Sequence, residues 1–491
     1  MLFNSYAFIF VYLPVVLVVY FQLARLGHAY AAGWLALASL VFYGYWNPAY
    51  VGLLLVSIIV NYAFGMWIAK ARGKPGRLSG GQLLSVAITI DLLLLGYYKY
   101  ANFFIASVNS VANVHLSVGD IILPLGISFF TFTQIAFLVD AWQGKVKEYN
   151  FIHYILFVTY FPHLIAGPVL HHGEMMPQFA QRHNYRVNWD HMADGILLFT
   201  LGLCKKVLWA DSFAPYARAV FAGVQRGEIP TIYEAWSGAL AYTMQIYFDF
   251  SGYTDMALGI ALMFNIRLPI NFASPYKATS IIDFWRRWHM TLSRFLRDYL
   301  YIPLGGNRKG KLRRYANLLG TMLLGGLWHG AGWTYVVWGA LHGIYLCVNH
   351  LWREWLPEKT WRWVPGWLGA LSGGVLTFVA VVVAWVVFYS ADIAHAVVML
   401  KAMFGVKFRY ITFDAVMHKQ LLLSTNLSGR ELVILLLSAF AWVWALPNST
   451  TLKFIKGNSL VMLAQATVVL YFLYLAIDRF GSYSPFLYFQ F

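Results

Sequence analysis

Long apolar runs recur along the whole chain, and short polar loops separate most of them. Several runs approach the length that a membrane-spanning helix needs, whereas others are too short or too interrupted by glycine to span alone. Since each span needs about 20 apolar residues, we predict about 11 to 13 membrane helices plus a few re-entrant or surface-lying pieces. The runs cover residues 6–24, 33–45, 49–69, 82–98, 121–139, 150–168, 195–210, 232–250, 252–266, 315–328, 333–352, 373–390, 431–446 and 458–477.

This pattern predicts an all-α polytopic membrane protein. Backbone in contact with lipid must satisfy its own hydrogen bonds, and the sequence shows no alternation typical of a membrane barrel. The first run is long for a signal peptide and has no basic segment before it, so we expect a retained span. We find no clear internal repeat and interpret the polar stretch 405–430 as a loop. The chain is therefore expected to be a single integral-membrane domain over residues 1–491, with a catalytic core at about 120–350.

The composition supports the same class of protein. Hydrophobic residues make up 60% of the chain and charged residues only 11%, compared with about 25% charged residues in soluble domains. The net charge of +16 arises mostly from short loops between apolar runs, as the positive-inside rule predicts for a protein in a lipid bilayer. We therefore expect no nucleic-acid partner. If the basic loops are cytoplasmic, both chain ends lie outside. Cys204 and Cys347 form no CxxC motif.

The most unusual segment is 283–314, which reads DFWRRWHMTLSRFLRDYLYIPLGGNRKGKLRR. Its aromatic and aliphatic residues recur at steps of three and four, which predicts one helix with an apolar face and a basic face. Such a helix normally lies at the membrane surface. Alternatively, some of its arginines bind a phosphate-bearing ligand, because a guanidinium pairs with phosphate in a bidentate manner. Its apolar face would consist of Phe284, Trp288, Leu292, Phe295 and Tyr299.

Three histidines lie in or near this segment. His289 belongs to WRRWHMTLS, and His329 lies in LLGGLWHGAGW, 14 residues after Tyr315. A helix rises about 1.5 Å per residue, so we expect His329 about 20 Å into the bilayer. A histidine at this depth is either a partner in a glycine-packed helix contact or a functional group facing a cavity. His342 is expected in the next helix, where it could face elsewhere.

Other polar residues in apolar surroundings are weaker candidates. Asp249 and Asp255 are expected to pair with a membrane arginine, although either could line a polar tunnel. Asn271, in LPINFASPYKA, follows a break bounded by proline and suits an irregular segment lining a cavity. The histidines of PHLIAGPVLHH lack a standard zinc spacing, so we expect no metal. The residues that we expect to bind a donor or line a tunnel are Arg286, Arg287, Arg294, Trp288, Trp328, Asn271 and Asp249.

A neutral buried histidine can take a proton from a hydroxyl as that hydroxyl attacks an activated carbonyl. A second histidine could orient the acceptor or stabilise the developing oxyanion. A thioester donor could then enter from the cytoplasm, with its phosphates on the basic face, while the acceptor enters from outside.

The longest motifs resemble a known family. The run from YFDFSGYTDMALG through NFASPYKATSIIDFWRRWHMTLSRFLRDYLYIPLGGNR to LLGGLWHGAGWTYVVWGALHG resembles the membrane-bound O-acyltransferase family. It is most similar to the bacterial branch that serves alginate O-acetylation, and more distantly to the D-alanyl transfer proteins of teichoic acid synthesis. PHLIAGP at 162–168 and the terminal FLYFQF are also similar to this branch.

The resemblance implies a helical membrane fold around a central tunnel and an O-acyltransferase activity. It implies that His329 of the WHG motif and His289 of the FWRRWH motif are catalytic. The implied co-substrate is acetyl-CoA or another acyl thioester, with no bound cofactor. The implied partners are periplasmic acetyltransferases of the SGNH type, or acceptor proteins, which modify an exported polysaccharide such as alginate or cellulose. The implied location is the bacterial inner membrane.

Two other functions fit the apolar pattern. A transporter for an acyl donor or polymer precursor would also bury polar groups in a membrane, but transporters usually show repeat symmetry. A scaffold that only docks a periplasmic acetyltransferase would not need His329. Loss of acetylation in a His329 variant is the observation that separates an enzyme from a scaffold.

Overall fold

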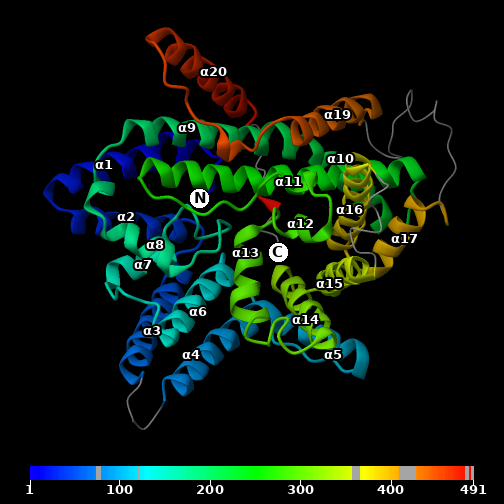
Figure 1. Cartoon of the computed structure of the whole chain (residues 1–491), viewed down its shortest axis with the longest axis horizontal. Coiled ribbons are helices and arrows are strands. Elements are labelled where there is room, and N and C mark those ends of the chain that lie inside the picture. Colours follow the sequence, from blue (N-terminus) through cyan, green and yellow to red (C-terminus); the bar gives the residue numbers. More distant parts are fainter. Residues whose placement is uncertain (73–78, 120, 356–364, 408–426, 481–485, 488–491) are drawn as a thin grey trace. The chain divides into compact units, whose positions relative to one another are not determined.

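The described part of the chain is built of helices and connecting loops. The computed structural model describes residues 1–72, 79–119, 121–355, 365–407, 427–480 and 486–487, and these residues contain no β-strand. The prediction of an all-α membrane fold is confirmed (Figure 1). Most of the polar stretch 405–430 lies outside the described residues. The prediction of 11 to 13 membrane helices stays a prediction, made on the basis of about 20 apolar residues per span.

Five helical segments among the described residues are long and apolar enough to cross a membrane. The first begins at Ala7, so the first predicted span is present as a helix. Other apolar runs form helices that are shorter or carry more polar residues. The five segments are Ala7–Leu26, Ala49–Ala71, Gly80–Ala112, Gly366–Tyr389 and Ser459–Asp478.

The chain divides into two compact units, each built from separate stretches of sequence. The first unit comprises Met1–Leu203, Tyr253–Ile270 and Lys453–Pro485. In it, α3, α4 and α6 pack against one another (Figure 1), and α2 packs against α7. Its helices are η1 (Ala7–Tyr12), α1 (Leu13–Leu26), α2 (His28–Gly44), α3 (Ala49–Ala71), α4 (Gly80–Leu95), η2 (Gly96–Tyr100), α5 (Ala101–Ala112), α6 (Ile127–Gln143), α7 (Phe151–Thr159), α8 (His172–Ala180), η3 (Arg182–Tyr185), nearly all of α9 (Trp189–Cys204) and α20 (Ser459–Asp478).

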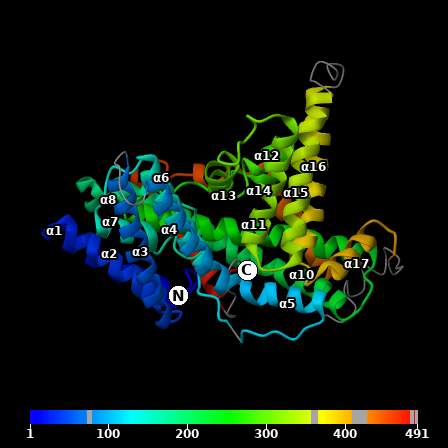
Figure 2. The same ribbon diagram turned by 90° about the horizontal axis from the view of Figure 1, so that it is seen from below.

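The second unit comprises Cys204–Gly252, Asn271–Leu452 and Phe486–Phe491. Its centre is formed by α14, α15 and α16, which lie next to one another (Figure 2). Its helices are η4 (Lys205–Ala210), α10 (Asp211–Gln225), most of α11 (Ile232–Met263), η5 (Pro275–Lys277), α12 (Ile281–Trp285), α13 (Met290–Leu296), η6 (Arg297–Tyr301), α14 (Lys311–His329), α15 (Trp333–Trp355), α16 (Gly366–Tyr389), α17 (Ile393–Met403), α19 (Gly429–Ala445) and η8 (Ser449–Thr451).

Helix α11 corrects one boundary of the sequence analysis. The runs 232–250 and 252–266 were predicted as separate pieces, but Ile232–Met263 is one helix of 32 residues. Ser251 and Gly252 interrupt the hydrophobicity of the run without removing any backbone hydrogen-bonding group, so the helix continues through them. This helix carries Asp249 and Phe250 into the second unit.

Helices α14 and α15 form a hairpin whose backbones touch through glycines. The connection is short, because α14 ends at His329 and α15 begins at Trp333. A Cβ atom on Gly326 would overlap the carbonyl oxygen of Tyr335, and one on Gly339 would overlap the carbonyl oxygen of Met322. Small residues at such contacts let helix backbones approach closely. The short connection confirms the prediction that His342 lies in the helix after the one that ends at His329.

This contact predicts a matched pair of substitutions. Gly339→Ala should destabilise the protein by about 1 to 3 kcal/mol, because the added methyl group overpacks the helix contact. Gly320→Ala on α14 is the control, since a Cβ there has open space around it. The measurement is the melting temperature of the detergent-solubilised protein. An equal melting temperature for the two variants would contradict the packing role of Gly339.

Candidate active site

The chain around the first candidate histidine is broken rather than continuous. Helix α12 ends at Trp285 and α13 begins at Met290, so the prediction of one continuous amphipathic helix through the apolar face from Phe284 to Tyr299 is wrong. The break occurs because His289 has φ +43° and ψ +52°, a left-handed conformation that a right-handed helix cannot contain. The apolar residues of the predicted face are nevertheless mostly buried: Phe284, Trp288, Leu292 and Phe295 are buried and Tyr299 is half-buried.

His289, the residue with the left-handed conformation, is also a buried polar residue. His289 is fully enclosed, and its Nδ1 lies 3.1 Å from Oδ1 of Asn271. A left-handed conformation in a non-glycine residue costs about 1 to 3 kcal/mol and persists only where its surroundings impose it. Here the backbone N–H of Met290 donates to the carbonyl of Asn271 over 3.0 Å. Asn271 therefore fixes both the backbone and the ring of this segment.

The partners of Asn271 determine which nitrogen of His289 carries the proton. Oδ1 of Asn271 accepts hydrogen bonds from the backbone N–H of Thr291 over 3.3 Å and from its hydroxyl over 2.8 Å. This oxygen is thus an acceptor, and Nδ1 of His289 must be the donor. Burial lowers the pKa of His289, which lies outside the five candidate spans, to about 3. The ring is therefore neutral at physiological pH, with its proton on Nδ1 and the lone pair on Nε2.

His329, the second candidate, is the last residue of α14 and is also buried. Its ring centroid lies 6.3 Å from that of His289. Trp328 is near both, with centroid distances of 4.9 Å to His329 and 6.0 Å to His289. The structure thus brings together His289, His329, Trp328 and Asn271, four of the residues singled out in the sequence. All four belong to the second unit.

Aromatic rings that the sequence analysis did not select enclose the two histidines. Phe250 of α11 lies 4.8 Å from the ring of His289, and Trp338 of α15 lies 5.0 Å from that of His329. Phe388 of α16 lies 5.6 Å from His329, so the enclosure extends beyond the predicted core of 120–350. Helical spacing in the sequence predicts that rings of this kind are buried. It does not predict which side chains they contact, because those contacts depend on how α11, α14, α15 and α16 pack.

His342 corrects another expectation. It belongs to α15, as predicted, but it does not face away from the site. Its ring lies 4.8 Å from Trp338, which in turn contacts His329. Trp338 and His342 are four residues apart on one helix, so their side chains lie on the same face.

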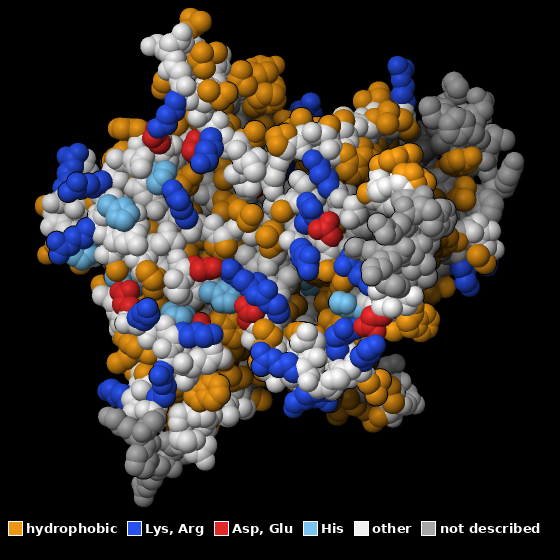
Figure 3. Space-filling model, viewed as in Figure 1, with side chains coloured by type: hydrophobic (Ala, Val, Ile, Leu, Met, Phe, Trp, Pro, Cys, Tyr) orange, Lys and Arg blue, Asp and Glu red, His pale blue; other side chains and the backbone are white. Residues whose placement is uncertain are grey.

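Trp288 and the arginines lie outside this group. Trp288 packs against Phe272 and Trp385, with ring centroids 5.0 Å away in each case. Trp385 in turn contacts Trp338. Arg287 pairs with Asp283 over 2.9 Å and donates to the carbonyl of Ala273. Arg286 is exposed and Arg294 is half-buried. Lys and Arg side chains gather on the face over α13 and α14 (Figure 3), so a donor-binding role for Arg286 and Arg294 stays a prediction.

Asp249 has a different set of partners. Its Oδ1 lies 2.7 Å from Nζ of Lys206, and its Oδ2 accepts the backbone N–H of Leu487 over 2.9 Å. Lys206 also pairs with Asp211 over 2.8 Å, and its ammonium group lies 5.0 Å from the ring of Phe486. The predicted ion pair is present, with lysine in place of arginine. Asp249 thus holds residues 486–487 against the second unit.

Glycines beside His329 could be expected to leave room for a substrate, but neighbouring side chains fill that space. A Cβ on Gly330 would overlap the ring of Tyr335, and one on Gly325 would lie 3.1 Å from Cδ1 of Leu296. Both positions are therefore filled by packing. A substitution at Gly330 is expected to disturb folding, and not activity alone.

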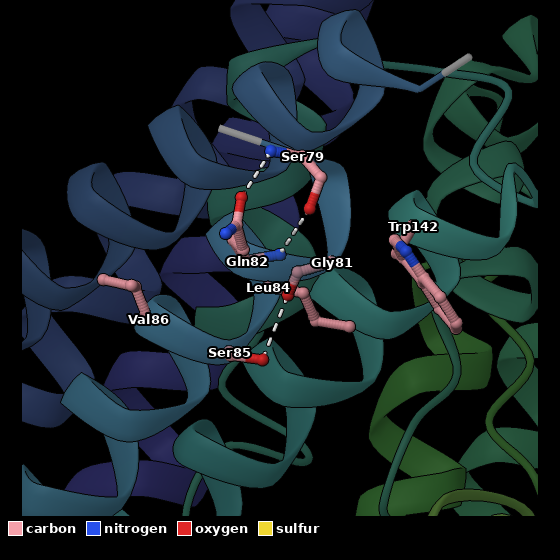
Figure 4. A pocket seen from close by; sticks show the side chains of 7 residues that line it. All are labelled: Ser79, Gly81, Gln82, Leu84, Ser85, Val86 and Trp142. Carbon is pink, nitrogen blue, oxygen red and sulfur yellow. Dashed lines mark hydrogen bonds between the residues drawn. The ribbon is translucent and has the colours of Figure 1, made fainter. Parts of the chain in front are cut away.

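A separate hollow opens on the surface of the first unit, between the start of α4 and Trp142 of α6 (Figure 4). The side chain of Ser79 accepts from the backbone of Gln82, and Gln82 accepts from that of Ser79. Among the described residues, its lining contains no acid, base or thiol that could take part in proton transfer. The lining residues are Ser79, Gly81, Gln82, Leu84, Ser85, Val86 and Trp142.

Comparison with known proteins shows the family of this chain. A model described as the membrane-bound O-acyltransferase family matches residues 40–390, a range that includes His289, His329 and the rings around them. The chain belongs to this family. It is therefore an acyltransferase and a multi-pass membrane protein.

Several curated acyltransferases are similar to this chain. A peptidoglycan O-acetyltransferase of Helicobacter pylori is 43% identical over 82% of this chain and 80% of its own length. A probable alginate O-acetylase, AlgI, of Pseudomonas putida is 38% identical over the full length of both chains. A teichoic acid D-alanyltransferase of Bacillus subtilis is 27% identical over 56% of this chain and 71% of its own length.

The ion pair of Asp249 predicts a loss of stability in Lys206→Met. Removing one partner of a buried pair leaves an uncompensated charge and typically costs about 3 to 5 kcal/mol. The double variant Lys206→Met with Asp249→Asn should recover most of this loss, because the amide oxygen still accepts from Leu487 and the buried carboxylate charge is removed. The carboxylate of Asp211, the other partner of Lys206, is 25% exposed and can be hydrated. The measurement is the melting temperature in detergent. A Lys206→Met protein as stable as the wild type would be inconsistent with the pair.

The hydrogen bond from His289 predicts the effect of changing Asn271. Asn271→Ala should lower acyl transfer by about 10- to 100-fold, a cost typical of losing a partner that orients a functional histidine. Thr291→Val is the control, because it removes one hydrogen bond to Asn271 and leaves the bond from His289. Transfer rates of both variants are compared at equal amounts of folded protein. Equal losses in the two variants would show that orientation of His289 is not the reason.

Proposed function

We propose that this acyltransferase moves an acetyl group from cytoplasmic acetyl-CoA towards an exported polysaccharide, through periplasmic partner proteins and across a bacterial inner membrane. The observation that supports this proposal best is the pair of buried histidines, one of which has its basic nitrogen defined by Asn271. The similarity to enzymes named for O-acetylation of peptidoglycan and alginate supports acetyl as the acyl group. Both named polymers carry sugar hydroxyls.

In the proposed reaction, His329 acts as the general base. It removes the proton of the acceptor hydroxyl as the oxygen attacks the carbonyl carbon of the thioester. The carbon–sulfur bond then breaks, and the departing thiolate takes the proton from His329. His289 accepts a hydrogen bond from an N–H or O–H group of a substrate through Nε2 and so orients it. The role of His329 as the base rests on the family resemblance. The role of His289 as a hydrogen-bond acceptor rests on its tautomer.

The aromatic enclosure contributes to this chemistry by excluding water. Trp328, Trp338 and Phe388 surround His329, so the imidazole lies in a medium of low dielectric constant. Such a medium favours the neutral ring that a base requires. It also keeps the activated acetyl group from hydrolysis. The basic residues over α13 and α14 would hold the phosphates of the donor (Figure 3).

The proposal is tested with His329→Ala in cells that make the acetylated polymer. The acetate content of the polymer should fall by about 10²- to 10⁴-fold, the usual contribution of a general base. His289→Ala should also reduce it strongly. The control is His350→Ala, which removes a histidine of α15 that contacts neither candidate. Unchanged acetate with His329→Ala at a normal protein level would favour a docking scaffold over an enzyme.

The donor is tested separately in inside-out membrane vesicles. Radiolabelled acetyl-CoA added outside should give labelled acceptor inside, and the label should be lost with His329→Ala. Transfer from a different thioester, with none from acetyl-CoA, would refute the proposed donor while leaving the acyltransferase activity intact.

A further inference from the structure

Helix α15 carries two buried side chains that can donate hydrogen bonds: Trp338, which contacts His329, and His342, which contacts Trp338. Trp338 is 1% exposed and His342 is 0% exposed, and their ring centroids are 4.8 Å apart at an interplanar angle of 66°. The reaction described above uses neither of them. Their polar atoms therefore need an explanation of their own.

The tautomer of His342 follows from its partner. The indole N–H of Trp285 lies 3.3 Å from Nδ1 of His342. An indole nitrogen can only donate, so Nδ1 must accept and the proton of the neutral ring lies on Nε2. Nε2 of His342 is thus a hydrogen-bond donor, whereas Nε2 of His289 is an acceptor.

Neither donor has an acceptor in the described part of the chain. Nε2 of His342 and Nε1 of Trp338 are both buried without a hydrogen-bond partner among the described residues. Buried polar groups in native proteins are almost always paired, and an exception usually indicates a function or a bound molecule. Two buried donors on neighbouring rings therefore indicate a binding site for one molecule that carries a hydrogen-bond acceptor.

The surroundings restrict the chemistry of that acceptor. The rings packed around Trp338 and His342 are aromatic: Phe284, Trp285, Trp385 and Phe388. An aromatic enclosure favours a neutral acceptor in the ground state, because burial of a full negative charge is costly. The site nevertheless adjoins His329, whose ring lies 5.0 Å from Trp338. A carbonyl oxygen that gains negative charge only during reaction meets both conditions.

We propose that Trp338 and His342 bind the carbonyl oxygen of the acyl thioester and stabilise the charge that develops on it; this inference rests on the proposed function. When the acceptor hydroxyl adds to the carbonyl carbon, the π electrons move to this oxygen and His329 takes the proton. When the carbon–sulfur bond breaks, the electrons return to form the new ester carbonyl and the thiolate receives the proton from His329. The two donors keep their own protons throughout.

The test compares two non-reacting analogues of acetyl-CoA. Acetylcarba(dethia)-coenzyme A is a ketone that keeps the carbonyl oxygen, and S-ethyl-coenzyme A lacks it. The wild type should bind the ketone at least tenfold more tightly. Trp338→Phe and His342→Phe, which keep an aromatic ring and remove the donor, should bring the two affinities close together. Trp352→Phe, an exposed position on the same helix, should preserve the wild-type ratio.

Turnover provides a second readout. Loss of one donor to a developing oxyanion typically lowers kcat by about 10² to 10³, so we expect such a decrease with Trp338→Phe, together with a rise in KM that is smaller than the decrease in kcat. His342→Gln keeps an N–H group and should recover part of the activity lost in His342→Phe. An unchanged affinity ratio in variants that bind both analogues would overturn the proposal and assign the donors to an internal water molecule.

A measurement on the wild type does not depend on whether the variants fold. The carbonyl of the bound ketone, labelled with ¹³C, should absorb at a lower infrared frequency than in an apolar solvent, because two hydrogen bonds weaken the C=O bond. An unshifted frequency in the bound state would overturn the subsite. If the wild type binds neither analogue but transfers acetyl groups from another donor, the coenzyme A assignment fails, and the proposed subsite for its carbonyl fails with it.

Discussion

The site depends on the contact between the backbones of α14 and α15. Gly326 and Gly339 lie where any side chain would overlap the opposite helix, so the two helices approach more closely than larger residues allow. This approach places His329, at the end of α14, against Trp338 on α15. Trp338 then connects His329 with His342. The spacing of two helix backbones therefore determines which side chains surround His329.

A second constraint is the pairing of buried polar groups. His289 adopts a left-handed conformation and is held by Asn271, which satisfies its ring nitrogen and the backbone that follows. The strain and the hydrogen bonds belong together, because an isolated left-handed residue would relax. The same bonds define the tautomer of His289. The two histidines thus present opposite hydrogen-bonding character: Nε2 of His289, which directly precedes α13, is an acceptor, and Nε2 of His342 on α15 is a donor.

The buried charges of the second unit are kept apart from this enclosure. Asp249 directly precedes Phe250, which contacts His289, yet its carboxylate is satisfied by Lys206 and by the backbone of Leu487. A buried carboxylate without such partners would be costly. The pairing holds residues 486–487 in place and satisfies the charge of Asp249 away from the histidines. An acidic residue within an apolar run therefore has a structural role here.

The sequence by itself determined the class of fold and the family, because hydrophobic periodicity and long motifs are local properties of the chain. Its motifs also singled out His289, His329, Trp328 and Asn271, which the structure brings together. The sequence also predicted that Asp249 has a buried cationic partner. Only the tertiary structure decided that residues 283–314 are broken at His289, since apolar spacing cannot reveal a left-handed residue. Only the packing of α14, α15 and α16 decided that Trp338, His342 and Phe388 join the site and that Gly330 is filled by Tyr335. Such contacts join residues far apart in the sequence, and they depend on helix orientation, which no local pattern specifies.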